Sequence, residues 1–527
     1  MNTPLYPWQR RQWLAALASL PWWTPTAQAD ELSEPDSGLR WPERTARQAL
    51  RLLADAAEHG LDPRDYAAAA LAARLPAALA HPGEAQAQRF AADLGAAVRR
   101  YLHDLAVGRV DPRRVHSNFS VAPRAGFDTA ALLATALSQG RLDEAVSAAV
   151  PPLPAYGQLR QTLAELRGLA AHPAWAHKLP PLPRPAGARA AKLEPGGAWD
   201  GLPLMAQRLA LLGDLVPGAP VPERFEGALL AALKAFQARH GLAADGVLGA
   251  GTLAALEVPP AARARQVALT MERMRWTPLT QGPRMVVVNI PEYVLYAYEV
   301  IDGRIEARLS MRVIVGKAMA HATPLFDERM RSIEFSPYWN VPPSIARAET
   351  VPRLRRDPGH WARQGFEFVA GNGAVDTVLS PSKLDAVLAG RLRIRQRPGP
   401  ANALGDIKFV FPNRDNIYLH HTPSVGLFAR ERRDFSHGCI RVEDPVALAR
   451  FVMAGMPGWD EARIRRQMAD GTSNHVALGA PLPVLIAYGT ALVKGGRPHF
   501  LPDVYGHDAR LQAALDLHQR STIPATP

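Results

Sequence analysis

One cysteine and one histidine near the end of the chain have the types and the spacing needed for acyl transfer. Cys439 is the only cysteine among the 527 residues, and His420 precedes it by nineteen positions. A thiol is a weak nucleophile until it ionises, and its free pKa is about 8.5. A neighbouring imidazole can lower this pKa by pairing as imidazolium with the thiolate, which is how cysteine-dependent acyl transfer is activated.

Two short strands would have to position this pair. Residues 417–419 (Ile-Tyr-Leu) predict the end of a buried strand, and residues 440–442 (Ile-Arg-Val) predict the start of the next one. The ends of two adjacent strands can bring groups nineteen positions apart within hydrogen-bond reach. Gly438 would let the backbone come close to a substrate carbonyl, so that N–H groups of this turn can hold an oxyanion.

Two other roles are open to Cys439. A lone cysteine is most often a small buried apolar residue. Cys439 could also bind zinc together with His420 and His437, although the compact paired spacings typical of zinc sites are absent. Acyl transfer through a thioester requires neither a metal nor an organic cofactor, and we expect none.

The whole stretch resembles the signature of the L,D-transpeptidases, whose catalytic domain is described as YkuD-like. The matching segments are residues 418–423 (Tyr-Leu-His-His-Thr-Pro) and 435–443 (Phe-Ser-His-Gly-Cys-Ile-Arg-Val-Glu), which look like the large proteobacterial periplasmic branch. The resemblance implies that Cys439 is the nucleophile and His420 its general base and acid. It also implies substrate or oxyanion contacts for a further set: Tyr418, Gly438, Arg441, Ser436, His437 and Trp339.

Composition restricts the class of partner. The formal charge of +12 and the pI near 10 suit an anionic neighbourhood such as cell wall, membrane surface or nucleic acid. Arginine and lysine are scattered, however, and no basic tract with interleaved aromatics predicts nucleic-acid binding. A single cysteine excludes an intrachain disulfide.

The first 29 residues are typical of a secretory signal. Arg10 and Arg11 precede a short apolar core, and Ala-Gln-Ala ends at Ala29, where we expect cleavage. The core is too short to span a bilayer. We therefore expect export to the periplasm, by the Sec or the twin-arginine route, and contact with the membrane only during export.

The remaining chain predicts several domains in series. Residues 30–170 have helical spacing and correspond to the scaffold segment of the family branch. Residues 171–203 are rich in proline and predict a linker. Residues 204–258 predict three helices and resemble a peptidoglycan-binding module, with Phe236-Gln237 and Asp245-Gly246 as the matching pattern. The alternative is a structural three-helix spacer.

Residues 262–510 predict the catalytic domain, followed by a tail at 511–527. Strand signals at 285–290, 293–300 and 304–315 indicate a mainly β, sandwich-like fold. Trp339 stands in a segment that resembles the part of the family domain that shapes the substrate groove. Alternatively, Trp339 is an ordinary aromatic residue of the core. Residues 345–394 lack strand rhythm and predict a helical capping insertion beside the site.

The resemblance implies a definite reaction. Cys439 would attack the bond between the third and fourth residues of a tetrapeptide stem and release D-alanine. The diaminopimelate amine of a neighbouring stem would then attack the thioester, which gives a 3→3 cross-link. The implied partners are stem peptides and glycan strands, with carbapenem-type β-lactams as covalent inhibitors. The residues themselves establish only a Cys–His acyltransferase. A peptidoglycan endopeptidase or carboxypeptidase, a lipoprotein-anchoring enzyme and an inactive wall-binding protein are the alternatives.

Overall fold

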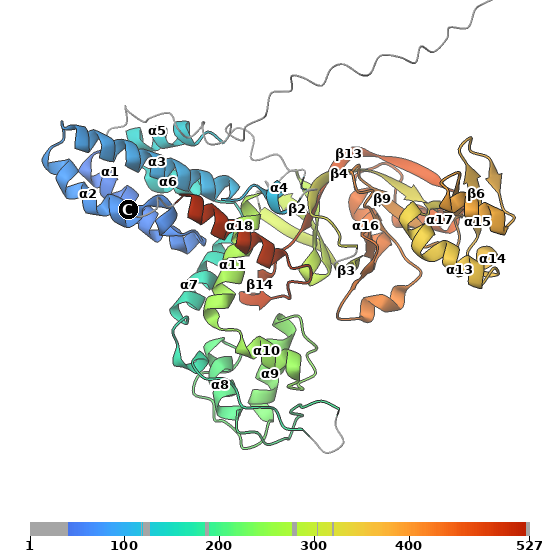
Figure 1. Cartoon of the computed structure of the whole chain (residues 1–527), viewed down its shortest axis with the longest axis horizontal. Helices are drawn as coiled ribbons and strands as arrows, with labels where there is room; N and C mark the ends of the chain where they lie inside the picture. Colours follow the sequence, from blue (N-terminus) through green and yellow to red (C-terminus); the bar gives the residue numbers. More distant parts are fainter. Residues whose placement is uncertain are drawn as a thin grey trace, which may run out of the picture.

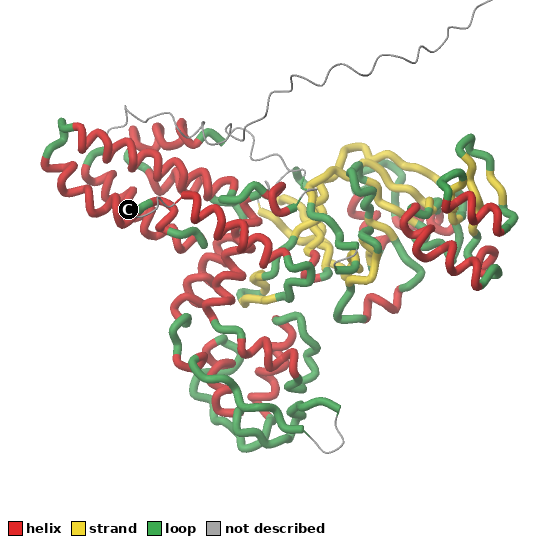
Figure 2. Tube along the Cα trace, viewed as in Figure 1, coloured by secondary structure: helices red, strands yellow, loops and turns green. Residues whose placement is uncertain are grey.

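The computed structural model divides the chain into three lobes around two central helices. It describes residues 41–116, 119, 127–184, 189–276, 282–302, 304–318 and 321–522. The expected signal segment therefore lies outside the described residues. Helices α11 (Pro260–Arg275) and α18 (His507–Thr522) lie where the lobes meet (Figure 1). Strands are concentrated in the C-terminal lobe, whereas the other two lobes are helical (Figure 2). Among the described residues, no helix has the length and apolarity required to cross a membrane.

The N-terminal lobe is a helical bundle. Its buried core is rich in alanine and leucine, and α3 contributes Leu94, Leu102 and Leu105 to it. Small residues allow the helices to pack closely at their contact faces. The bundle comprises α1 (Glu43–Ala54), α2 (Ala68–Ala80), α3 (Ala85–Val107), α5 (Thr129–Gln139) and α6 (Leu142–Ala149), whereas the short α4 (Pro112–Val115) lies beside the C-terminal lobe. Helix α7 (Pro154–Gly168) leaves this bundle and packs against α11 instead.

The second lobe is a small three-helix unit of α8 (Leu202–Leu211), α9 (Gly227–Arg239) and α10 (Ala250–Glu257). The preceding segment, residues 171–203, was expected to be a linker, and it is part of this lobe. Leu179 and Leu193 are buried in its core, and Leu193 forms a β-bridge with Leu248. The prolines break helix formation there, but the leucines between them still have apolar surface to bury.

The C-terminal lobe is built on one sheet that closes on itself. The strand order is β11-β3-β12-β10-β9-β4-β13-β1-β2, and β2 also pairs with β3. Its strands are β1 (Arg284–Asn289), β2 (Val294–Ile301), β3 (Arg304–Gly316), β4 (Phe326–Phe335), β9 (Ile407–Val410), β10 (Leu419–His420), β11 (Asp434–Ser436), β12 (Ile440–Val442) and β13 (Asn474–Ala487). Beyond β13, β14 (Ala491–Lys494) forms a hairpin with β15 (Arg497–Phe500).

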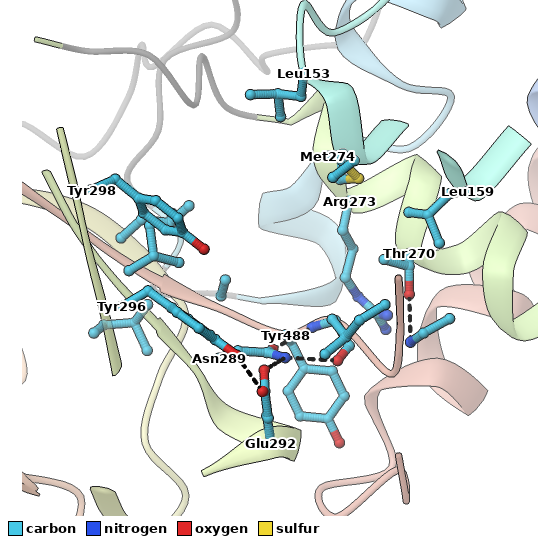
Figure 3. A pocket seen from close by; sticks show the side chains of 18 of the residues that line it. Leu153, Leu159, Thr270, Arg273, Met274, Asn289, Glu292, Tyr296, Tyr298 and Tyr488 are labelled. Carbon is cyan, nitrogen blue, oxygen red and sulfur yellow. Dashed lines mark hydrogen bonds between the residues drawn. The ribbon is translucent and has the colours of Figure 1, made fainter. Parts of the chain in front are cut away.

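Side chains along each strand point alternately into the ring and toward its outer face. Val286 and Val288 of β1 are fully buried in the core, whereas Val287 points outward. On the outer side, β1, β2 and β13 lie opposite α7 and α11 (Figure 3). Helices α16 (Pro445–Val452) and α17 (Glu461–Ala469) complete the packing around the core.

The capping insertion is not purely helical, which corrects the expectation. Its helices are α12 (Pro343–Ile345), a π-helical turn (Ala346–Thr350), α13 (Val351–Arg356), α14 (His360–Arg363) and α15 (Pro381–Leu388). They pack on a separate sheet with the order β5-β8-β6-β7, namely β5 (Trp339–Asn340), β6 (Phe366–Ala370), β7 (Val375–Asp376) and β8 (Leu392–Gln396). Phe366 and Phe368 bury their rings under these helices. The two phenylalanines stand at alternate positions, so their burial favours a strand here, although charged residues elsewhere in the segment are typical of helices.

The expected C-terminal tail is also corrected. Residues 511–522 belong to α18, and Leu511 and Leu515 are buried in the core of the catalytic ring. Their spacing of four places them on one helix face. The rest of that segment lies outside the described residues.

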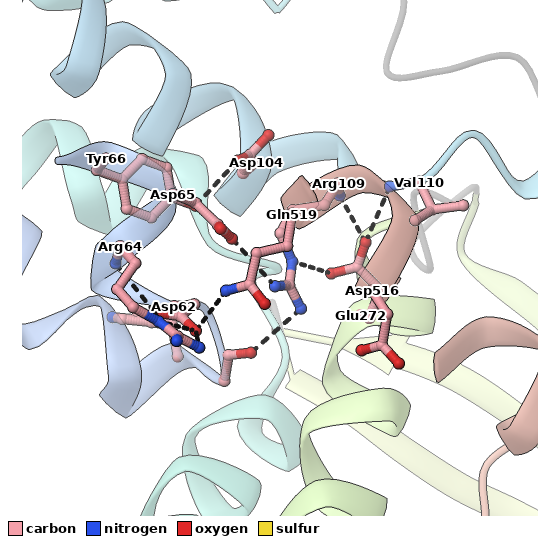
Figure 4. Close-up of polar contacts among 12 residues, drawn as sticks. Asp62, Arg64, Asp65, Tyr66, Asp104, Arg109, Val110, Glu272, Asp516 and Gln519 are labelled. Carbon is pink, nitrogen blue, oxygen red and sulfur yellow. Dashed lines mark hydrogen bonds and ion pairs between the residues drawn. The ribbon is translucent and has the colours of Figure 1, made fainter. Parts of the chain in front are cut away.

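Buried charges join the N-terminal bundle to α11 (Figure 4). Glu272 is fully buried and accepts hydrogen bonds from the backbone N–H of Arg109 at 2.5 Å and of Val110 at 3.3 Å. Its other oxygen pairs with Arg275 at 2.8 Å. Burial raises the pKa of Glu272, but the positive charges of Arg109 and Arg275 outweigh this and hold it below its usual value. The interface therefore depends on an ionised carboxylate that water does not reach.

The three-helix unit is fixed to the catalytic lobe in a similar way. Asp214 is buried and accepts a hydrogen bond from Arg239 Nε at 2.7 Å, and Arg497 of the β14–β15 hairpin pairs with the same carboxylate at 3.3 Å. Arg239 also donates to the Pro498 carbonyl at 3.1 Å. These contacts anchor the unit on the catalytic lobe.

Candidate active site

The two short strands expected around the Cys–His pair are parallel neighbours in the ring. Leu419 of β10 lies opposite Ile440 of β12, and both side chains are fully buried in the core. The residues next to them in sequence point to the other face. That outer face receives four polar side chains from these strands: Tyr418, His420, Cys439 and Arg441.

The turn before β12 holds Cys439 in place. Gly438 has φ +116°, and an added Cβ would lie 3.1 Å from Ile417 Cδ1, so glycine is required here. Ser436 Oγ donates to the Cys439 carbonyl at 2.5 Å and accepts from the Gly438 N–H at 3.2 Å. Thr323 Oγ1 donates to the Gly438 carbonyl at 2.7 Å. The Gly438 N–H expected at the oxyanion is thus already engaged by Ser436.

The thiol of Cys439 is partly exposed. Its Sγ donates to the Asn416 carbonyl at 3.7 Å, and the Tyr418 hydroxyl is also hydrogen-bonded to it. Burial raises the pKa of the Cys439 thiol above its usual value. Hydrogen bonding by Tyr418 and the positive charges of Lys408 and Arg441 lower the pKa without cancelling the effect of burial.

The imidazole of His420 is buried and fixed in one tautomer. Its Nδ1 lies 2.5 Å from the His421 carbonyl oxygen, which can only accept, so Nδ1 carries the proton; the backbone of Leu404 is a second hydrogen-bond partner of the ring. Burial, followed by the charge of Arg441, lowers the pKa of His420 to about 3. The imidazole is therefore neutral near pH 7. Together with the raised thiol pKa, this favours a neutral resting pair over the thiolate–imidazolium pair considered from the sequence.

These shifts predict how Cys439 reacts with a small neutral electrophile. Iodoacetamide reacts with the thiolate, so alkylation should be slow at neutral pH and should rise through an apparent pKa of the thiol above its usual value. Alkylation rates from pH 5 to 10, followed by intact mass, measure this directly. A plateau extending below pH 6 would indicate a preformed ion pair and would contradict the neutral pair.

Trp339 connects the capping insertion to the site. It lies on β5, packs partly against the cap's core, and is hydrogen-bonded to Tyr418, whose hydroxyl is also hydrogen-bonded to Cys439. Burial raises the pKa of Tyr418 well above its usual value, so its hydroxyl stays protonated. Trp339 is therefore both a cap residue and a neighbour of the site.

His437 faces away from the thiol chemistry and toward the cap. Its Nε2 lies 2.6 Å from Glu349 Oε1 on the π-helical turn, and its ring packs at 4.7 Å from that of His321. Among the residues that the structure describes, no group of three His, Cys, Asp or Glu side chains is arranged to hold a metal ion. The zinc alternative thus lacks a ligand set in this part of the chain.

Three residues near the site were not found from the sequence. Lys408 of β9 lies opposite His420 and places its ammonium 4.4 Å from the centre of the Tyr418 ring. Lys408 stands between the inward-facing Ile407 and Phe409, so the alternation of side chains along a strand would have placed it on the outer face. Asn416 contributes only its carbonyl, and Glu349 arrives from an insertion ninety positions away in sequence, so neither left a signal in side-chain type or spacing.

Comparison with known families finds three matches along the chain. Residues 283–463 match the L,D-transpeptidase catalytic domain model, YkuD. Residues 37–163 match a scaffold domain, and residues 202–256 match a model described as "Putative peptidoglycan binding domain". The matches follow the order helical bundle, three-helix unit and β-rich lobe seen in the structure.

A curated relative supports the same assignment over part of the chain. The "Putative L,D-transpeptidase" of Haemophilus influenzae is 32% identical over 253 residues, which is 47% of this chain and 49% of the relative. This chain thus spans about half the length of that protein. Among solved structures, Bd1075 of Bdellovibrio bacteriovorus covers 45% of this chain and 55% of its own at 15% identity, with a TM-score of 0.16, which is too low to carry an argument.

Proposed function

This chain carries a YkuD-type L,D-transpeptidase catalytic domain behind a scaffold domain and a peptidoglycan-binding domain, and from this premise we propose that it forms 3→3 cross-links between peptidoglycan stem peptides. The observation that supports this most is the pairing of β10 with β12. It presents the only thiol of the chain and a neutral, tautomer-fixed imidazole on one face of the sheet. A thiol beside a positioned base is the arrangement needed for covalent acyl transfer.

The first half-reaction forms a thioester. The Cys439 sulfur attacks the carbonyl that joins the third and fourth residues of a tetrapeptide donor, while His420 Nε2 takes the thiol proton. Because the Gly438 N–H is already bonded to Ser436, we assign the developing oxyanion to the N–H of Cys439 itself. His420 then protonates the departing D-alanine amine, and the thioester remains.

The second half-reaction transfers the acyl group. The side-chain amine of diaminopimelate on an acceptor stem attacks the thioester carbonyl and loses its proton to His420. The new amide bond forms as the Cys439 thiol leaves. The charges of Arg441 and Lys408 favour negative charge on sulfur at both steps, which offsets part of the cost of burial.

Product analysis with a defined donor tests this function. The purified protein should convert disaccharide-tetrapeptide into a cross-linked dimer with loss of one D-alanine per cross-link, identified by mass. A disaccharide-tripeptide as the only product would indicate a carboxypeptidase. Absence of any acyl-enzyme would refute the transferase.

The peptidoglycan-binding domain is consistent with a position at the cell wall, and we propose that the protein acts in the periplasm. The expected export signal at residues 1–29 supports this placement. Cell fractionation with an antibody tests it: recovery in the cytoplasmic fraction alone would contradict the proposal.

We also propose that the insertion at 345–394 covers the substrate groove. It touches the site directly through Glu349 at His437, and its sheet pairs with β5, whose Trp339 is hydrogen-bonded to Tyr418. Its helices and sheet have a separate core, so it can move as a unit. Amide exchange should be faster here than in β4 and β9, and should slow after acylation. Uniform protection before and after acylation would contradict a covering role.

A further inference from the structure

A cavity of about 480 Å³ lies on the outer face of the catalytic ring, away from Cys439. Its floor is formed by the outward-facing side chains of β1, β2 and β13, and its roof by α7 and α11. Figure 3 shows Tyr296 and Tyr298 on one side and Leu153, Leu159 and Met274 on the other. The volume is within the range of about 300–1,000 Å³ that is typical of small-molecule sites.

The walls of the cavity are mostly apolar. Leu159 and Met274 belong to the packed layer between α7 and α11, and Val287 lies in the floor. Tyr296 and Tyr298 stack with ring centroids 5.7 Å apart and present a flat apolar surface. Such walls favour an aliphatic chain, since each methylene that is removed from water contributes favourably to binding.

One charged group in this wall lacks part of its hydrogen bonding. Arg273 is 8% exposed, pairs through Nη1 with Asp508 at 2.6 Å and lies over the ring of Tyr488 at 5.1 Å. Within the described residues, its Nε and Nη2 have no hydrogen-bond partner. Buried donors without an acceptor are costly, and more so when they carry charge. In Figure 3 its guanidinium runs down one side of the cavity.

The acidic group of the cavity is already neutralised. Glu292 accepts from the Tyr296 hydroxyl at 2.5 Å and from Asn289 at 3.2 Å, and it pairs with Lys494. It therefore offers no attraction to a second cation. The unsatisfied N–H donors of Arg273, together with the paired state of Glu292, favour binding of an anion in this cavity.

We propose that this cavity binds a single-chain amphiphile with an anionic head, such as a fatty acid. The apolar chain lies between the two tyrosines and the α7–α11 roof, and the head accepts hydrogen bonds from Arg273 Nε and Nη2. Phosphate and carboxylate heads present the same acceptor geometry to a guanidinium. The proposal concerns a second site and does not depend on the acyl-transfer chemistry.

Calorimetry with three probes on the full chain tests both halves of the proposed ligand. Decanoate should bind with one site per chain, and decan-1-ol, which keeps the chain but lacks the charge, should bind roughly 10- to 100-fold more weakly, as expected for lost hydrogen bonds to a charged group. Acetate, which keeps only the head, should not bind measurably. Equal affinity for the acid and the alcohol would overturn the role of Arg273. Vesicles of an anionic phospholipid, if bound while decanoate is not, would overturn the single-chain ligand.

Two variants locate the site. Arg273→Met should weaken decanoate binding to the level of the alcohol. Since Arg273 also pairs with Asp508, a second variant leaves that pair intact: Val287→Trp fills the floor of the cavity and should abolish binding. Val375→Trp adds the same side chain to exposed strand β7 of the cap and should bind like the wild type. Unchanged decanoate affinity in Val287→Trp would overturn the proposal.

Discussion

Replacing Cys439 by alanine is expected to abolish covalent capture of a carbapenem. The chain contains no other thiol, and the proposed reaction needs a sulfur nucleophile on the face shared with His420. The nearby hydroxyl of Ser436 should not replace the thiol as nucleophile, because its Oγ is engaged with the Cys439 carbonyl and the Gly438 N–H. Intact mass over time should show a full adduct on the wild type and none on Cys439→Ala.

His420→Ala is expected to slow carbapenem acylation by about 10²–10⁴-fold, which is the usual contribution of a positioned acid–base group. Reversible binding should change little, because the imidazole acts on the thiol proton. The double variant should be no worse than Cys439→Ala, since residues that act as a unit are not additive. An adduct that persists on Cys439→Ala, or activity that requires zinc, would overturn the mechanism.

Replacing the buried Glu272 by glutamine is expected to be strongly destabilising. The variant keeps the size of the side chain and one acceptor for the Arg109 N–H, but it removes the charge that balances Arg109 and Arg275. Breaking a buried ion pair from one side typically costs about 3–5 kcal/mol. The free energy of unfolding, measured in urea by far-UV circular dichroism, should fall by about this amount.

The pH dependence of stability should distinguish the wild type from this variant. The folded-state pKa of Glu272 is depressed, so its contribution is present above the unfolded value of about 4.3 and is lost as pH falls through the folded pKa. Glu272→Gln should lack this acid-dependent loss. Glu461→Gln provides the control, because Glu461 pairs with Arg450 and Arg465 at the exposed surface and its removal should change stability little. Equal effects of both substitutions would contradict the buried network.

Local patterns were sufficient to predict the main parts of the fold. Residues 204–258 were expected to form three helices, and Leu229, Leu233 and Phe236, which recur at helical spacing, are buried together in the three-helix unit. The strand ends at residues 419 and 440 were expected to be adjacent, and they are paired. In each case a period of 3.6 or 2 is present within a few residues, so the burial pattern can be read locally.

Contacts between segments that are distant in the sequence could not be predicted. The burial of Leu179 and Leu193 depends on the surface of α8–α10, and a proline-rich composition alone gives no sign of it. The same holds for Glu349, whose pairing with His437 requires the cap to fold over the turn that holds Cys439. The resting protonation of Cys439 and His420 also depends on burial, which spacing does not reveal.

The place of β13 in the closed sheet has a consequence for the order in which the molecule is made. This strand comes last in chain order among the strands of the sheet, yet it pairs in parallel with β1 and antiparallel with β4, which precede it by well over a hundred positions. A nascent chain that ends before Asn474 has exposed edges on both of those strands, and the ring cannot close. Such long-range pairing is slow to form, because distant segments must meet first. The two helical lobes can therefore form while the thiol-bearing lobe is still open, and the ring closes only after β13 has been made.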